Sequence, residues 1–301
     1  QPSSQGSNAA LEDFEGVLSI PSDSLADPAG LHLFTRNIKV PAYSIQRFYL
    51  YAKFPETPSA PALELRTTNG RLLATYPLNV QPLTPGNVLL LTVAKDLAPL
   101  RLPPLPGVDP VMRANTPPDR LPEQWWGYES CGALILTTWS ETYLRPAQEA
   151  ALEQWLKTGG TLVVLTGSDA AAWKGGLIDR ALPGTVTKSE RIRVNPSGGA
   201  TLVTDSAAPI EKGDIVVSRL EPNLDAQILA SVDGLPLLAR SRFGRGTVLF
   251  FAVDFQNNAD AISQVFTPLW RAVIPYDPVT GTRFTWRSDM RASTQVVSRR
   301  A

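Results

Sequence analysis

The stretch Gly132-Ala-Leu-Ile-Leu-Thr-Thr-Trp-Ser-Glu141 and its continuation Gln148-Glu-Ala-Ala-Leu-Glu-Gln-Trp-Leu-Lys-Thr-Gly-Gly-Thr-Leu-Val-Val-Leu-Thr-Gly-Ser-Asp169 decide the fold. The first apolar run predicts a buried strand over Ala133–Leu136, and apolar residues at helical spacing then predict a helix over Pro146–Lys157. A Gly-Gly pair ends this helix and leads into a second apolar strand, Thr161–Leu165. Strand, helix and strand in this order form one βαβ unit, which predicts a parallel sheet and an α/β domain.

The turn Gly167-Ser168-Asp169 follows the second strand, where many α/β enzymes hold a nucleophile. Ser168 takes about that position, but the chain has one histidine, His32, and it lies in the other expected domain. A Ser–Lys pair would require a lysine such as Lys174 to be desolvated beside the hydroxyl, and only nearness in sequence supports that. We expect Ser168 and Asp169 instead to cap a short helix, and we expect no catalytic residue in the chain.

Composition limits the class of protein. The 301 residues exceed the usual size of one hydrophobic core, so we expect two or three domains. Hydrophobic residues make up 43% and charged residues 19%, as in a globular chain. Lys plus Arg and Asp plus Glu both number 28, so the net charge is zero and a nucleic-acid partner is not expected. The single cysteine, Cys131, excludes an internal disulfide framework and reads as a small apolar residue.

Residues 11–97 predict a β-sandwich, since short apolar runs alternate with turn residues at even spacing. The expected strands are Phe14–Ile20, Leu31–Val40, Ser44–Lys53, Ala62–Thr67, Arg71–Pro77 and Asn87–Val93. Thr68-Asn-Gly-Arg71 predicts a hairpin with a type I′ turn, because Asn-Gly supplies the positive φ angles that this turn needs. Residues 98–122 are rich in proline and predict a semi-rigid linker.

The second half of the chain is expected to hold an α/β domain interrupted by a β-rich insertion. Residues 123–178 and 235–275 form the α/β domain, residues 179–234 the insertion and residues 276–301 an extended tail. Apolar residues at helical spacing predict a closing helix over 259–272. The acidic residues of the insertion lack the spacing of a calcium loop and read as turn residues, so neither a metal nor a cofactor is expected.

Trp125 and Trp126 stand just before the first strand of the βαβ unit. Adjacent indoles offer a platform for a sugar or another aromatic ligand. They equally suit the cover of a sheet edge, which we expect to be their main role. Together with Ser168 and Asp169 they make the candidate ligand or interaction surface.

These features together resemble the class I glutamine amidotransferase-like domains, especially the noncatalytic versions of bacterial envelope and membrane-anchored proteins. The resemblance is carried by Tyr128, Gly132–Leu136, the helix from Gln148 to Leu156, the run from Gly159 to Gly167, and Gly244-Arg-Gly246 before an apolar strand that leads to Asp254-Phe255. Catalytic members of the family place a cysteine in the turn that here reads Gly167-Ser168-Asp169, with a histidine and an acid later. Since this turn has no cysteine and no histidine follows it, the resemblance implies the fold without the amidotransferase activity.

We therefore expect a noncatalytic scaffold or protein-interaction module of the bacterial cell envelope. Its expected partners are other envelope proteins or the rest of a membrane-anchored complex. Two alternatives stay open. One is a module that binds carbohydrate or cell-wall polymer through the β-sandwich and Trp125–Trp126, and the other is a hydrolase that uses Ser168.

Two segments bear on location. The polar, low-complexity start over residues 1–8 resembles the end that remains after a signal peptide is removed, so we expect an extracytoplasmic protein of the periplasm or cell envelope. The arginine-rich residues 287–300 of the tail suit an approach to a membrane surface or to an acidic partner, with a solvated tail as the default expectation.

Overall fold

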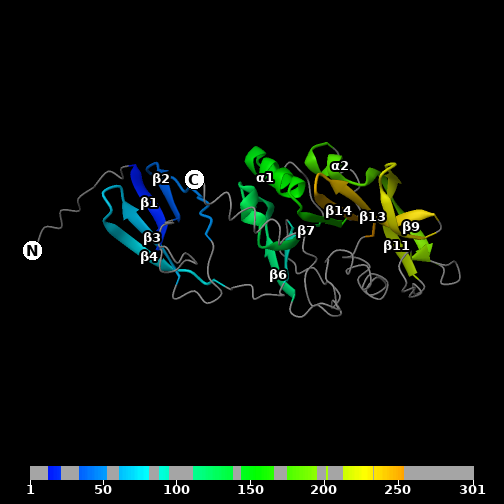
Figure 1. Ribbon diagram of the computed structural model, residues 1–301, viewed down its shortest axis with the longest axis horizontal. Helices are drawn as coiled ribbons and strands as arrows, with labels where there is room; N and C mark the ends of the chain where they lie inside the picture. The colour runs from blue at the N-terminus through cyan, green and yellow to red at the C-terminus, as the bar shows by residue number, and fades with distance from the viewer. Residues whose placement is uncertain are drawn as a thin grey trace, which may run out of the picture. The chain divides into compact units, whose positions relative to one another are not determined.

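The computed structural model describes residues 13–21, 34–52, 61–80, 88–94, 111–137, 144–165, 175–194, 201–202, 213–232 and 234–253. The chain divides into two compact units (Figure 1): unit 1, residues 1–84, and unit 2, residues 85–301. The closing helix predicted over 259–272 and the tail over 276–301 lie outside the described residues.

Unit 1 is built on one four-stranded antiparallel sheet in the order β2-β1-β3-β4. Its strands are β1 (Phe14–Ile20), β2 (Phe34–Val40), β3 (Ala62–Thr67) and β4 (Leu72–Pro77). All four strands were expected at these places, to within three residues. The described residues supply one sheet layer, so the second layer of the predicted sandwich is not among them. The strand expected over Ser44–Lys53 is wrong for residues 44–52, whose alternating pattern has no partner strand in the described part of the chain.

The β3–β4 hairpin forms where Asn-Gly predicted it, but with a different turn. The N–H of Gly70 donates to the Thr67 carbonyl at 2.9 Å, and the N–H of Thr67 donates to the Arg71 carbonyl at 2.9 Å. Gly70 has a φ of 87°, whereas Asn69 is not among the residues with positive φ. These two hydrogen bonds and a single positive φ, at Gly70, are features of a type I turn with a glycine bulge, so the type I′ prediction is wrong. The Asn69 side-chain oxygen accepts a hydrogen bond from the Thr67 hydroxyl, which holds Asn69 in this turn.

Unit 2 has an α/β fold around an eight-stranded mixed sheet in the order β10-β12-β13-β14-β8-β7-β5-β6. Strands β14, β8, β7, β5 and β6 run parallel to one another, while β10, β12 and β13 join by antiparallel pairing. A separate two-stranded ribbon pairs β11 with β9. The bounds are β5 Val88–Val93, β6 Val111–Thr116, β7 Cys131–Leu136, β8 Thr161–Leu165, β9 Gly184–Val194, β10 Thr201–Leu202, β11 Gly213–Pro222, β12 Gln227–Val232, β13 Leu235–Phe243 and β14 Gly246–Phe251.

The sheet corrects the expected domain boundaries. Strand β5 pairs in parallel with β7 and β6, so the boundary expected at residue 97 and the linker expected over 98–122 are wrong. The continuous apolar run of β5, Val-Leu-Leu-Leu-Thr-Val, is typical of a strand buried on both faces, not of a sandwich strand with one wet face. The expected insertion, 179–234, is also not separate, because its strands β10 and β12 extend the main sheet through β13.

Two α-helices, α1 (Pro146–Lys157) and α2 (Leu177–Ala181), lie on the same face of the sheet (Figure 1). Helix α1 begins and ends where the sequence predicted, while α2 was not foreseen. The buried core beneath them includes Leu134, Leu136, Leu152, Trp155, Leu162, Val164, Val248 and Phe250. The alternate side chains of the same strands are also buried, among them Leu90, Ile135, Val163, Leu249 and Phe251. The central strands are therefore apolar on both faces, as the predicted parallel sheet requires.

Glycines fix the approach of the β13–β14 turn to the end of α1. A Cβ added at Gly246 would lie 2.2 Å from the Leu156 carbonyl oxygen, and Gly244 has a φ of 61°. The N–H of Arg245, between them, donates to the Lys157 carbonyl at 3.0 Å. This bond satisfies one of the carbonyls that the last turn of a helix leaves without a partner. The Gly-Arg-Gly sequence thus joins two elements that are far apart along the chain.

Candidate functional site

The carboxyl ends of the parallel strands are the place where open α/β sheets bind ligands. Thr137 follows β7 there, and its N–H and hydroxyl both donate to the Val93 carbonyl at the end of β5, at 3.2 and 3.3 Å. Ser168 and Asp169 follow β8 but lie outside the described residues. Their predicted capping role and the alternative of a Ser168 hydrolase therefore stay predictions.

Cys131 stands at the opposite, amino end of β7. It is buried and belongs to the core cluster beneath the helices, which confirms its predicted role as a small apolar residue. His32 lies outside the described residues. Within the described ranges no group of three or more His, Cys, Asp and Glu side chains is placed to hold a metal ion.

Trp125 and Trp126 begin the 3-10 helix η3 (Trp125–Tyr128), just before β7. The two ring centroids are 5.9 Å apart with an interplanar angle of 75°, an edge-to-face contact. Trp125 packs against the core, whereas Trp126 is 46% exposed. One indole therefore packs on the core, as expected for a cover of the sheet, while the other faces solvent. It does not form a flat platform of two coplanar rings.

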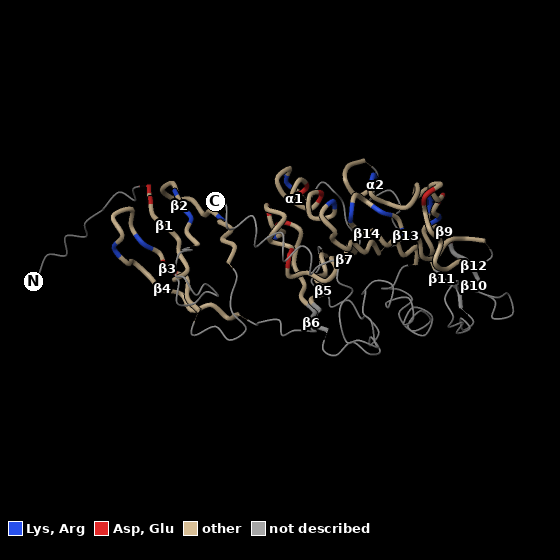
Figure 2. The backbone as a smooth tube through the Cα atoms, viewed as in Figure 1, with Lys and Arg blue, Asp and Glu red and all other residues tan. Residues whose placement is uncertain are grey.

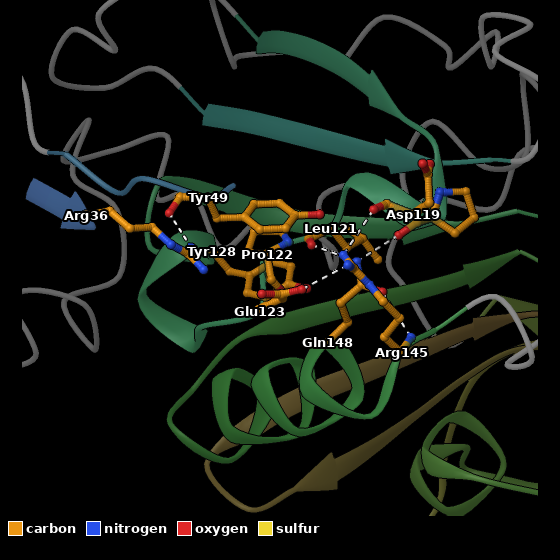
Figure 3. Close-up of polar contacts among 10 residues, drawn as sticks. Arg36, Tyr49, Asp119, Leu121, Pro122, Glu123, Tyr128, Arg145 and Gln148 are labelled. Atoms are coloured by element: carbon orange, nitrogen blue, oxygen red, sulfur yellow. Dashed lines mark hydrogen bonds and ion pairs between the residues drawn. The ribbon is translucent and has the colours of Figure 1, made fainter. Parts of the chain in front are cut away.

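Helix α1 holds one end of the segment that carries η3 (Figure 3). The buried amide of Gln148 donates from Nε2 to the Leu121 carbonyl at 2.8 Å and to the Pro118 carbonyl at 3.3 Å. Its Oε1 accepts from the N–H of Arg145 at 3.0 Å. The Arg145 guanidinium lies 3.0 Å from Glu123 in an ion pair. Sequence reasoning missed this contact, although a glutamine three residues after the helix cap is a known capping pattern.

Tyr128 holds the other end of the segment. It is fully buried, its ring centroid lies 5.4 Å from that of Trp155 on α1, and its hydroxyl donates to the Pro122 carbonyl at 3.2 Å. Residues 118–128 are thus held against α1 by hydrogen bonds near the start of the helix and by a ring contact near its end. Trp126 is therefore exposed to solvent on a segment that α1 holds in place.

A second exposed feature lies in unit 1, in the turn over residues 41–45 after β2. Tyr43 has a φ of 58°, a left-handed conformation that residues other than glycine seldom adopt. Ser44 donates to the Pro41 carbonyl from its N–H at 3.2 Å and from its hydroxyl at 2.7 Å. The N–H of Ala42 donates to the Asp13 carboxylate at 3.0 Å. We call these residues the 41–45 turn.

The 41–45 turn presents two apolar side chains to solvent. Tyr43 is 86% exposed and Ile45 is 102% exposed. Sequence reasoning missed the turn because the alternation that follows it predicts a strand from Ser44. The signal that was available is the proline at position 41, which follows the last residue of β2 and often marks the end of a strand.

The described residues contain no helix that combines the length and the hydropathy of a membrane span.

Comparison with known proteins gives structural neighbours of low identity. No family model matches the chain, and no curated protein matches it. A putative ThuA-like protein from Bacteroides uniformis is 15% identical with a TM-score of 0.44, covering 67% of this chain and 96% of that one. A cytoplasmic protein from Salmonella typhimurium LT2 is 15% identical with a TM-score of 0.43, covering 62% of this chain and 94% of that one. A beta-galactosidase from Bacillus circulans is 15% identical with a TM-score of 0.35, covering 56% of this chain and 26% of that one. At these identities and scores, the neighbours assign no function to the chain.

Proposed function

We propose that the chain is a noncatalytic protein-interaction module of the bacterial cell envelope. Unit 2 acts as an amidotransferase-like scaffold, and unit 1 makes the contact with a partner protein. The observation that carries this proposal is the 41–45 turn, which holds Tyr43 and Ile45 outward in a defined conformation.

The 41–45 turn has no evident reason to exist for the stability of unit 1. A left-handed conformation at a residue other than glycine costs on the order of 1 kcal/mol. Two large apolar side chains in water recover none of that cost, since they bury almost no surface. The hydrogen bonds of Ser44 and Ala42 nevertheless keep the turn ordered. An ordered turn with an exposed tyrosine and isoleucine suits insertion into a pocket of another protein, where aromatic anchors contribute most.

The amidotransferase-like part of the proposal has separate support. Parallel β7 and β8 are joined by α1, and β14 lies parallel beside β8, with the Gly244–Gly246 turn against α1. This is the arrangement that the sequence resemblance implies. The envelope location, and partners among envelope proteins or the rest of a membrane-anchored complex, are carried over from the same resemblance.

Site-specific photo-cross-linking in the native cell tests the proposal. Benzoylphenylalanine replaces Tyr43 or Ile45, and the matched control carries it at Leu224, which is fully exposed in unit 2. We expect both unit 1 positions to give the same protein adduct in the envelope fraction, and the control to give none. Absence of adducts at both positions, equal adducts at the control, or recovery of the protein outside the envelope fraction would each contradict the proposal.

Trp126 supports one alternative function, recognition of carbohydrate or cell-wall polymer. Its exposed indole stands on a segment fixed to α1 by Gln148 and Tyr128, and an exposed ring face is a common surface for sugar binding. Pull-down with purified cell-wall polymer tests this alternative. Retention that is lost in Trp126→Ala but kept in Tyr43→Ala would favour it over the protein-interaction role, and no retention would exclude that polymer as a ligand.

A further inference from the structure

Strand β4 leaves one edge of the unit 1 sheet open among the described strands, since it stands last in the order β2-β1-β3-β4. Its sequence and the following residue, Leu72-Leu-Ala-Thr-Tyr-Pro-Leu78, contain no charged side chain. The β4 tube is uniformly tan in Figure 2, whereas charged residues mark the other strands of the sheet. Proteins usually protect such an edge with charges. Because β4 carries no charged side chain, its open edge is a surface for pairing with another strand.

The backbone groups that β4 turns outward follow from its register with β3. The N–H of Leu78 donates to the Pro61 carbonyl at 2.8 Å, which makes this a hydrogen-bonded pair. Because hydrogen-bonded and non-bonded pairs alternate in an antiparallel ladder, the pairs Ala62–Pro77 and Glu64–Thr75 are non-bonded. The N–H and carbonyl of Thr75 and the carbonyl of Pro77 therefore point away from β3. Pro77 has no N–H, and at this position an N–H would point away from β3, so the pairing of β3 with β4 loses no hydrogen bond.

Apolar side chains flank both faces of this edge. Leu72 and Tyr76 project on opposite faces, because the register shift interrupts the alternation of side chains between Leu72 and Ala74. Leu72, Leu73 and Tyr76 are all exposed. A strand added beside β4 would cover part of each. The edge therefore offers outward hydrogen-bonding groups together with apolar surface on both sides.

We propose that two copies of the chain pair through β4, antiparallel, around a two-fold axis at Thr75. In this register each Thr75 N–H donates to the Thr75 carbonyl of the partner subunit, so the same outward groups are satisfied on both sides. Tyr76 then lies across from the half-buried Ala74 of the partner subunit, on the same face, so that the tyrosine ring can cover it. The contact is isologous, and the two four-stranded sheets become one continuous sheet.

Charge favours a second copy at β4 over pairing at the opposite edge. Two β4 strands bring no like charges together. Strand β2, at the other edge, carries Arg36 and Lys39, so a pair of β2 strands would set cations near each other. The β3–β4 register shift between Leu65 and Arg66 bends the start of β4 and limits the new ladder to a few residues. We therefore expect a weak dimer with a dissociation constant in the micromolar range or above.

Sedimentation of the full chain over a concentration series tests the pairing. We expect a reversible monomer–dimer equilibrium that Tyr76→Lys weakens by roughly tenfold or more, since it places two cations across the axis. Thr75→Pro, which removes only an outward N–H, should weaken it similarly. The matched control is Thr35→Lys, which adds the same charge at an exposed position of β2 and should leave the equilibrium unchanged. Thermal unfolding of each variant shows whether it has folded.

A cysteine at the axis gives a second measurement. Directly opposed residues in a hydrogen-bonded pair have Cα atoms about 5.5 Å apart, within the range that a disulfide spans. Because the native Cys131 is buried, Thr75→Cys should form a covalent dimer on mild oxidation and Thr35→Cys should not. A monomer at all concentrations, or a dimer that neither Tyr76→Lys nor Thr75→Pro weakens, would overturn the proposal. The pairing through β4 uses none of residues 41–45. The dimer can therefore be absent while the photo-cross-links are obtained, and the photo-cross-links can be absent while the dimer forms.

Discussion

At the scale of single residues, the positions that matter most in unit 2 are those whose role depends on distant partners. Gln148 is predicted from sequence as part of an amphipathic helix, yet in the structure its buried amide bonds to carbonyls about 30 residues earlier in the chain. The spacing of apolar residues within the helix does not predict a contact with those carbonyls. Trp125 and Trp126 could be singled out because adjacent indoles are conspicuous, but only the structure divides them into a packed ring and an exposed one.

Gln148→Leu should destabilise unit 2 by about 2–3 kcal/mol. The substitution keeps the apolar bulk but leaves the buried carbonyls of Leu121 and Pro118 without a donor. Gln154→Leu on the exposed face of the same helix is the matched control and should change stability by less than about 0.5 kcal/mol. Denaturant unfolding followed by tryptophan fluorescence measures both. Equal effects of the two substitutions would show that the amide contacts contribute nothing.

At the scale of elements, local pattern was a good guide wherever an element carries its own signal. Strands β1, β3 and β8 and helix α1 begin and end where the sequence predicted. The misses share a physical cause. Strand β6, Val-Met-Arg-Ala-Asn-Thr, has a weak pattern of its own and exists because β5 pairs with it. The alternation that follows the 41–45 turn has no partner strand in the described part of the chain. Pairing of distant segments overrides local preference in these places.

Gly246→Ala should separate a contact between elements from a simple loss of backbone freedom. An added Cβ would lie 2.2 Å from the Leu156 carbonyl oxygen, so the β13–β14 turn must move off α1. We expect a loss of about 3 kcal/mol or more, with reduced packing around Trp155. Gly70→Ala is the control, since Gly70 has a φ of 87° but open space around it, and should cost about 1 kcal/mol. Thermal unfolding compares the two, and a smaller loss for Gly246→Ala would show that the turn yields easily.

At the scale of the whole molecule, the sequence predicted two or three domains, and the structure has two compact units that divide at another place than predicted. The apolar run of β5 follows a β-rich region in the sequence, which predicts that it belongs to the β-sandwich of that region. Its partners, β7 and β6, place it inside the sheet of unit 2. The predicted site shows the same limit, because Ser168 and Asp169 were chosen by their place after a strand, and their structural role is still a prediction.

The corrected boundary predicts the behaviour of fragments. Residues 85–301 should fold alone, with a cooperative thermal transition and the near-ultraviolet circular dichroism of packed tryptophans, because the fragment keeps all eight strands of the sheet. A fragment that starts at residue 98, the boundary suggested by sequence, lacks β5 from between β7 and β6 and should lose the cooperative transition. If the shorter fragment unfolds with the same midpoint and cooperativity, β5 is dispensable and the correction is wrong.

The parallel pairing of β14 with β8 also bears on the speed of folding. Thr247 lies opposite Thr161 in this register, so a segment of 86 residues (247 − 161) must be closed before the two strands meet. The entropy lost in closing such a loop corresponds to roughly 4 kcal/mol, and no pairing between these strands compensates for it until the ends have come together. A sheet whose centre depends on so distant a contact has a high contact order and is expected to refold slowly, in milliseconds to seconds. During that interval the βαβ unit from β7 to β8 is complete, while the edge of β8 that pairs with β14 is still without its partner strand.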